Sequence, residues 1–389
     1  MLITIIVFLV ILSLLVLVHE AGHFFTAKKF GIKVEEFGFG FPPRLFAKKI
    51  GETLYSINWL PIGGFVKLYG EDEAGGGKIR ISKSEIRNNK EDIKRAFFAR
   101  PVWQRALVIV AGVAMNFLLS VVIISYMFGV SGVKMPADKV IVTDLVKGAP
   151  AEVAGIKKGD TIEAINGTKI TNTDQLISIT KKHLGEEIVL RINPSTKFRV
   201  KDQPFDKVQG KKSNIKDIKL IPRKTYPKNE GPMGIAISQD IITKKYPLYL
   251  APLVGTKEAL HTSWLIVSGL GKMVFDLISQ GQAPEGVAGP VGIARLTGQF
   301  VEIGPLAVMS FLAILSLNLA ILNILPIPAL DGGRLFFILI ELILGKRVSQ
   351  KFEAKAHAVG MAILLTLVAV ITLNDIIKVF SGQPIIPKP

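Results

Sequence analysis

A nearly unbroken apolar run over residues 2–18 constrains the fold of this chain more than any other feature. A helix of that length and composition reaches most of the way across a hydrocarbon core. The run passes directly into His19-Glu20-Ala21-Gly22-His23. Ionisable groups at such depth are costly and are by default functional. The sequence therefore predicts a membrane helix that carries chemistry at one end.

The two histidines in that stretch have the spacing of a metal site. His19 and His23 share a face of a helix, so both imidazoles can point to one cation. Glu20 projects about 100° away and can act on a water at that cation without being a ligand. Two imidazoles suit zinc, and a catalytic zinc takes a third protein ligand. The alternative is a pair of helix-end histidines at the headgroup level.

The composition agrees with a membrane protein. Hydrophobic residues make up 49% of the 389 residues, and the mean hydropathy is +0.42. In such a chain the net charge of +17 reflects the orientation of the spans and attraction to anionic lipid headgroups. The chain has no zinc-finger pattern and no phosphate-binding loop, so we expect no nucleic-acid partner. Cysteine is absent, which excludes disulfides and thiolate ligands.

Four membrane spans are expected, at residues 1–27, 102–130, 304–345 and 355–380. The first is expected to be a retained span and not a cleaved signal peptide, because basic residues follow it and cleavage would discard the histidines. The basic flanks of the spans place both termini outside the cytoplasm. Asn116 in the second span is expected to make an interhelical hydrogen bond.

Residues 241–303 are expected to form an amphipathic interfacial connection. Their best apolar window, residues 260–278, contains Lys272 and Asp276. If this window spanned the membrane, the next span would carry its acidic motif to the opposite face from His19. The remaining histidines are expected to be surface or structural residues: His183, His261 and His357.

The basic loop 28–101, cytoplasmic or re-entrant, contains two apolar stretches broken by glycine. Gly38 and Gly40 punctuate the first, and Gly63 and Gly64 punctuate the second. Their β-branched and aromatic residues predict a pair of strands. Whether this pair is associated with the membrane or is a soluble hairpin on the cytoplasmic surface stays open.

The third span is expected to break near its end. Pro326 and Pro328 are followed by Gly332 and Gly333, and such a break at membrane depth is tolerated only where the backbone lines protein or a wet cavity. Asp331 lies at this break and is a candidate third metal ligand. It could instead cap the helix that follows.

Residues 133–240 change character, with many polar residues and short β-rich runs. An Asn166-Gly167 pair predicts a hairpin turn, and a short helix is expected to open at Thr173. The pattern resembles one PDZ domain of the type found in bacterial secreted proteases. Such domains bind peptides by strand addition beside their helix.

Together these pieces resemble the site-2 protease family of intramembrane zinc metalloproteases, in its bacterial RseP- and RasP-like branch with a single PDZ domain. The matching segments are HEAGH, FGFGF, LPIGGFVKLYGED, WQRALVIVAG, GPVGIA and SLNLAILNILPIPALDGG, in the family's order over nearly the whole chain. The chain departs from the branch at Val113, where proline is usual. Its one PDZ domain stands in place of the tandem pair of the proteobacterial proteins, which favours the single-PDZ type.

The resemblance implies a site and a substrate class. The zinc ligands it implies, for one Zn²⁺ per chain, are His19, His23 and Asp331, with Glu20 as general base. The substrate contacts it implies are Asn318, Asn323, Gly38, Gly40, Gly63 and Gly64. The enzyme is then expected to cleave within or near the transmembrane segment of single-pass membrane proteins, such as anti-sigma factors or signal-peptide remnants.

The expected fold is a polytopic α-helical membrane protein of about four transmembrane helices. It has a membrane-associated β-hairpin region and one inserted extracytoplasmic PDZ domain, open to a peptide ligand. The expected location is the inner membrane of a bacterium, in contact with lipid. One alternative is a zinc transporter, which predicts ligands along several spans. Another is a non-proteolytic PDZ scaffold, which would tolerate loss of Glu20.

Overall fold

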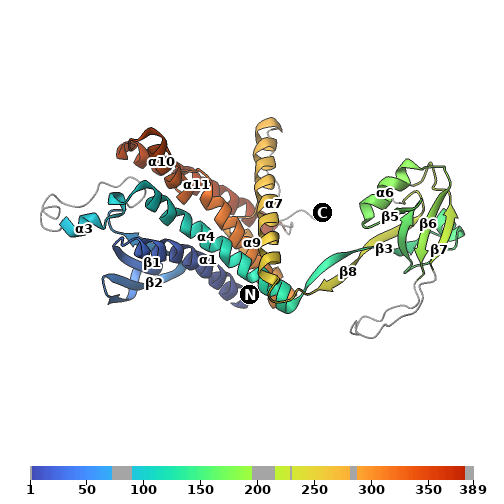
Figure 1. Cartoon of the computed structure of the whole chain (residues 1–389), viewed down its shortest axis with the longest axis horizontal. Coiled ribbons are helices and arrows are strands. Elements are labelled where there is room, and N and C mark those ends of the chain that lie inside the picture. The colour runs from blue at the N-terminus through green and yellow to red at the C-terminus, as the bar shows by residue number, and fades with distance from the viewer. Residues whose placement is uncertain (1, 72–89, 195–214, 228–229, 281–286, 382–389) are drawn as a thin grey trace. The chain divides into compact units, whose positions relative to one another are not determined.

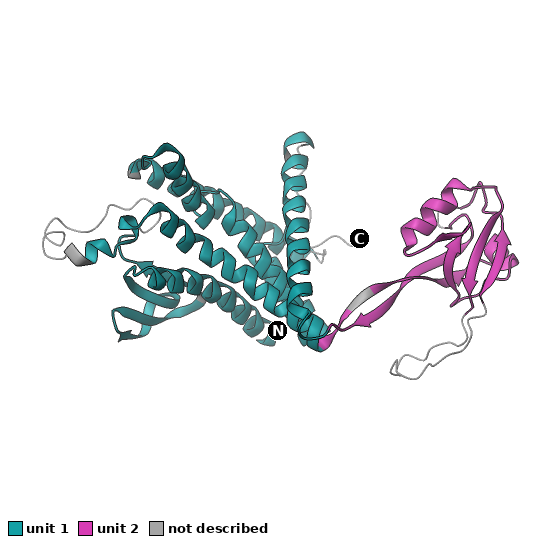
Figure 2. Ribbon diagram, in the orientation of Figure 1, with its two compact units in different colours: residues 1–130, 247–389 teal, residues 131–246 magenta. Residues whose placement is uncertain are grey.

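The chain forms two compact units. The computed structural model describes residues 2–71, 90–194, 215–227, 230–280 and 287–381. One unit comprises Met1–Val130 and Pro247–Pro389, and the other comprises Ser131–Tyr246 (Figure 2). The second unit is therefore an insertion in the sequence of the first.

The first unit is a bundle of helices with a small β region. Its helices are α1 (Leu2–Lys29), α3 (Lys90–Lys94), α4 (Val102–Tyr126), α7 (Ala251–Gln280), α8 (Pro290–Ile303), α9 (Pro305–Ile324), α10 (Asp331–Leu344) and α11 (Gln350–Phe380) (Figure 1). Two short turns of helix, η1 (Phe97–Ala99) and η2 (Met127–Ser131), flank α4. Among the described residues, the stretches apolar and long enough to cross a membrane are Leu2–Lys29, Val102–Ser131, Pro305–Ile324 and Lys351–Phe380. Each overlaps one of the four predicted spans, although Pro305–Ile324 covers only the first part of the predicted span 304–345.

Small residues allow the central helices to approach closely. A Cβ at Gly22 on α1 would overlap the Ala111 carbonyl oxygen on α4. On the other side of α4, the Ser316 hydroxyl of α9 donates to the Asn116 carbonyl oxygen at 2.7 Å. Both features are typical of helix packing in membranes, where small residues and hydrogen bonds join the helices.

The segment predicted as an interfacial connection contains two separate helices. The predicted apolar window lies within α7, whose Ala259 is buried with Val121 of α4 and Leu317 of α9. Helix α8 is an additional helix that the sequence analysis did not separate from its surroundings. It packs into the bundle, where Phe300 stacks on Phe311 of α9 with ring centroids 4.5 Å apart. The N-terminal amides of α8 are anchored to Asp375 on α11.

The two glycine-punctuated stretches are strands, as predicted: β1 (Val34–Ile50) and β2 (Thr53–Leu68), which pair antiparallel. Each strand bends and folds back, so that the pairing is more complex than one hairpin. Residues 34–39 pair with residues 64–68 on one side and with residues 54–57 on the other. Residues 64–68 therefore form an outer edge of this region, and α1 packs against β2.

The second unit is an antiparallel sheet with two helices. Its elements are β3 (Val133–Leu145), α5 (Pro150–Val153), β4 (Thr161–Ile165), β5 (Thr168–Lys169), α6 (Thr173–Lys182), β6 (Ile188–Asn193), β7 (Lys216–Leu220) and β8 (Ile235–Lys244). The strand order is β7-β6-β4-β3-β8, with β5 paired to β4. The predicted turn joins β4 to β5, with Asn166 and Gly167 at φ 47° and 79°. The core includes Ile162, Leu176 and Leu190.

Candidate metal centre

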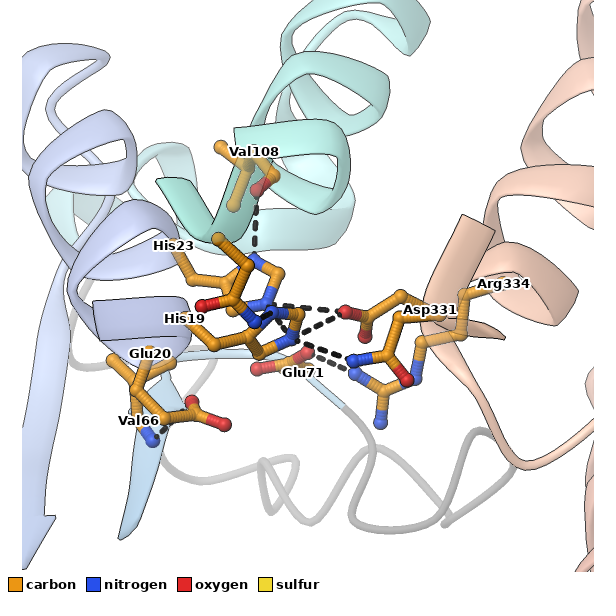
Figure 3. A network of polar contacts seen from close by, with 10 residues as sticks. His19, Glu20, His23, Val66, Glu71, Val108, Asp331 and Arg334 are labelled. Carbon is orange, nitrogen blue, oxygen red and sulfur yellow. Dashed lines mark hydrogen bonds and ion pairs between the residues drawn. The ribbon is translucent and has the colours of Figure 1, made fainter. Parts of the chain in front are cut away.

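Three possible metal ligands from distant parts of the chain converge in the first unit (Figure 3). His19 Nε2 lies 2.8 Å from Asp331 Oδ2, and His23 Nε2 lies 3.3 Å from the same oxygen. The two Nε2 atoms are 3.2 Å apart. Tetrahedral zinc with bonds of about 2.0–2.2 Å would hold its ligand atoms about 3.3–3.6 Å apart. The observed separations are close to that, and the two imidazoles and one carboxylate are ligands that zinc accepts.

Asp331 reaches the histidines because the chain turns sharply between α9 and α10. A Cβ at Gly332 would overlap the Leu325 carbonyl oxygen, so only glycine lets α10 begin this close to the end of α9. The N-cap of α10 is Leu330, and Asp331 is the first residue of the helix. The alternative that Asp331 serves as the N-cap is therefore wrong, and its carboxylate faces the two imidazoles.

Backbone and amide groups orient the two rings. The His23 Nδ1–H donates to the Val108 carbonyl oxygen at 2.8 Å, which leaves the Nε2 lone pair for a metal. His19 Nδ1 lies 3.4 Å from the Asn116 side-chain amide. Turning that amide would present Oδ1, which has no partner in the described part of the chain, as an acceptor for the ring N–H. Asn116 thus lies at the metal centre, a placement that the sequence alone did not predict.

Glu20 lies beside the three ligand atoms and faces a cavity. Its Oε2 accepts a hydrogen bond from the Val66 amide at 3.0 Å, at the outer edge of β2. The cavity has a volume of about 580 Å³, which is typical of a ligand pocket. Its lining includes Glu20, His23 and Asp331 together with residues 65–68 of β2. A strand edge and the carboxylate of Glu20 therefore meet at the candidate metal centre.

The predicted substrate-contact residues are distributed unevenly. Asn323 Nδ2 lies 3.4 Å from His19 Nε2, whereas Asn318 makes no hydrogen bond to the cluster among the described residues. The glycines are required by the backbone of the β region itself. Gly40 has φ +75°, and a Cβ at Gly64 would lie 2.9 Å from the Gly38 carbonyl oxygen. They do not line the cavity.

An ion pair that was not predicted from the sequence lies in the lining of the cavity. The Arg334 guanidinium, one turn after Asp331 on α10, contacts the Glu71 carboxylate just beyond β2 (Figure 3). Both residues line the cavity. Glu71 belongs to the LPIGGFVKLYGED segment, whereas Arg334 directly follows the SLNLAILNILPIPALDGG segment. Their pairing depends on how the β region folds back toward α10.

Comparisons with known proteins agree over most of the chain. The family model described as peptidase family M50 matches residues 7–367. The zinc metalloprotease RasP of Geobacillus kaustophilus is 32% identical, over 97% of this chain and 98% of its own length. The regulator of sigma-W protease RasP of Bacillus subtilis is 31% identical, over 97% and 99%. A putative zinc metalloprotease of Fusobacterium nucleatum is 33% identical, over 97% and 100%.

Proposed function

The chain belongs to peptidase family M50, and we propose that His19, His23 and Asp331 are the ligands of its catalytic zinc. It is a polytopic helical membrane protein and a zinc metalloprotease of the site-2 type, which acts by intramembrane proteolysis. The observation that carries the assignment of the ligands is the convergence of three donor atoms from α1 and α10 on one point.

The residues around the ligands have separate tasks in peptide hydrolysis. Zinc, when bound, supplies a Lewis acid that activates water and polarises the scissile carbonyl. Glu20 takes a proton from the attacking water and passes it to the leaving amine. The Val108 carbonyl oxygen keeps the proton of His23 on Nδ1, and Asn116 does the same for His19. Asn323 is close enough to contact a substrate held there.

The substrates are single-pass membrane proteins that the enzyme must first unwind. A transmembrane helix hides its carbonyl groups in hydrogen bonds, so no peptide bond in it is open to attack until it is extended. The outer edge of β2 at residues 64–68 can bind an extended segment by strand addition, directly beside Glu20. One relative is named a regulator of sigma-W protease, which favours anti-sigma factors, with signal-peptide remnants as a second class.

The inserted unit is a single PDZ domain on the extracytoplasmic side of a bacterial inner membrane. Its hairpin turn and its short helix α6 follow the pattern expected for that domain. Strand β8 pairs only with β3 among the described strands, and α6 packs near it. A peptide could therefore add to the open edge of β8 beside α6.

A cleavage assay with controlled zinc tests the proposed ligands. Purified protein should cut a tagged transmembrane substrate, stop when a chelator removes zinc, and recover when zinc is restored. His19→Ala and Asp331→Ala should each purify with far less zinc than the wild type. If either variant kept the full zinc content, that residue would not be a ligand.

A further inference from the structure

The loop that delivers Asp331 is held in a conformation that its own sequence disfavours. Ala329, two residues before Asp331, has φ +88°. Residues with a Cβ rarely adopt such values, and they persist only where the surroundings fix them. The position of Asp331 therefore depends on a contact that keeps Ala329 in place.

Helix α11 supplies that contact. The Ala329 amide donates a hydrogen bond to Nδ1 of His357 at 2.9 Å. One turn further along α11, a Cβ at Gly360 would overlap the Pro328 carbonyl oxygen, so the helix backbone lies directly against the loop. His357 and Gly360 lie on one face of α11 and contact the consecutive residues Ala329 and Pro328.

The orientation of the His357 ring is fixed by its packing and by this hydrogen bond. The side chain is buried, with 4% of the residue exposed, and its ring centroid lies 5.7 Å from that of Phe337 on α10. Because Nδ1 accepts the Ala329 proton, the ring proton is on Nε2. Nε2 has no hydrogen-bond partner within the part of the chain that the structure describes. The ring is therefore oriented by packing and by the Ala329 amide.

We propose that His357 is a positioning residue of the metal centre. Through the Ala329 amide it fixes the turn between α9 and α10, so that the Asp331 carboxylate meets His19 and His23. The sequence alone predicts a surface or structural role for His357, since nothing in its neighbourhood along the chain marks it. This proposal rests on the proposed role of Asp331 as a zinc ligand.

Substitutions that move the acceptor atom distinguish positioning from simple packing. In His357→Asn the side-chain oxygen stands where Nδ1 stood, whereas His357→Gln carries its polar atoms to the place of Nε2. His357→Leu has no acceptor. In competition with a zinc chelator, His357→Leu and His357→Gln should bind zinc about tenfold more weakly than the wild type, and His357→Asn within about twofold. His261→Asn, at an exposed histidine, is the matched control and should change nothing.

A second substitution tests the route through Ala329. Glycine adopts positive φ without strain, so Ala329→Gly makes the conformation of the loop less dependent on the hydrogen bond to His357. In the Ala329→Gly background, His357→Leu should therefore lose less zinc affinity, about threefold instead of about tenfold. A histidine that only fills space would lose the same factor in both backgrounds.

The same titration separates this proposal from the ligand assignment. Asp331→Asn serves as the reference: if it binds zinc as the wild type does, the ligand assignment fails. If Asp331→Asn loses zinc while the Asn, Gln and Leu variants of His357 all bind it equally, His357 does not position Asp331. Should His357→Leu fail to fold, the comparison of His357→Asn with His357→Gln still decides the question.

Discussion

Gly112 on α4 determines how much room the two histidine rings have. A Cβ at this position would overlap His23 Nε2 and lie 2.8 Å from His19 Cε1. The backbone of α4 therefore forms the floor of the metal centre. No substitution that adds a side chain here leaves the donor atoms where they are.

Gly112→Ala is expected to abolish zinc binding and cleavage without altering any ligand. The added methyl group displaces both rings, and α4 cannot retreat because it packs on α1 and α9. Elemental analysis of the purified protein measures the zinc content. Gly269→Ala on α7 is the matched control, because a Cβ there has no neighbour within 4 Å. Full zinc content in Gly112→Ala would contradict the observed packing.

The residues of the site differ in whether their place there can be predicted from the sequence. The spacing of His19 and His23 is local, so it could be predicted without a structure. Asp331 could be proposed because prolines and glycines mark its turn. Asn116 and His357 contact the site across helix interfaces, and a contact between helices leaves no local signal in one sequence.

At the scale of elements, α11 holds α8 through one buried carboxylate. Asp375 Oδ2 accepts from the Gly289 amide at 2.8 Å and from the Gly292 amide at 2.7 Å. These amides belong to the N-terminal turn of α8, which has no side-chain cap of its own. The carboxylate thus satisfies amides that would otherwise be buried without acceptors.

Asp375→Ala is expected to destabilise the protein by about 2 kcal/mol or more, because two buried amides lose their acceptor. Asp375→Asn keeps one acceptor oxygen and should cost less. Thermal unfolding in detergent measures the difference. Asn374→Ala, at the exposed neighbouring position, should leave the unfolding temperature unchanged. Equal unfolding temperatures for Asp375→Ala and Asn374→Ala would show that the carboxylate does not anchor α8.

The elements themselves were predictable to different degrees. Long apolar runs gave α1, α4, α9 and α11 because a membrane span needs that length. The strand pair followed from its aromatic and β-branched residues, but the fold-back of each strand did not. That fold-back depends on pairing between residues 34–39 and two separate segments, which one-dimensional patterns do not encode.

In the proposed topology of the whole molecule, the inserted unit and the basic turn before α11 face opposite sides of the membrane. With four spans and the basic flanks in the cytoplasm, we expect residues 131–246 outside and the turn after α10 in the cytoplasm. Because the chain has no cysteine, a single introduced cysteine reports its own side.

A cysteine replacing Lys182 on α6 should react with an impermeant thiol reagent only from the outside. A cysteine replacing Lys346 should react only from the cytoplasmic side. Both positions are exposed, so accessibility does not limit the reaction. In intact cells the reagent reaches only the outer side of the membrane, and in inverted vesicles it reaches only the cytoplasmic side. Reaction at position 182 from the cytoplasmic side would overturn the four-span topology.

The proposed role of Glu20 in hydrolysis is tested by measuring zinc content and cleavage together on Glu20→Gln. In the proposed mechanism Glu20 acts on water, and it is not one of the converging ligands. The variant should therefore keep the zinc content of the wild type and lose at least about a hundredfold in cleavage of a transmembrane substrate. Glu302→Gln, at an exposed glutamate, should change neither quantity. Cleavage by Glu20→Gln at the wild-type rate would contradict the proposed mechanism.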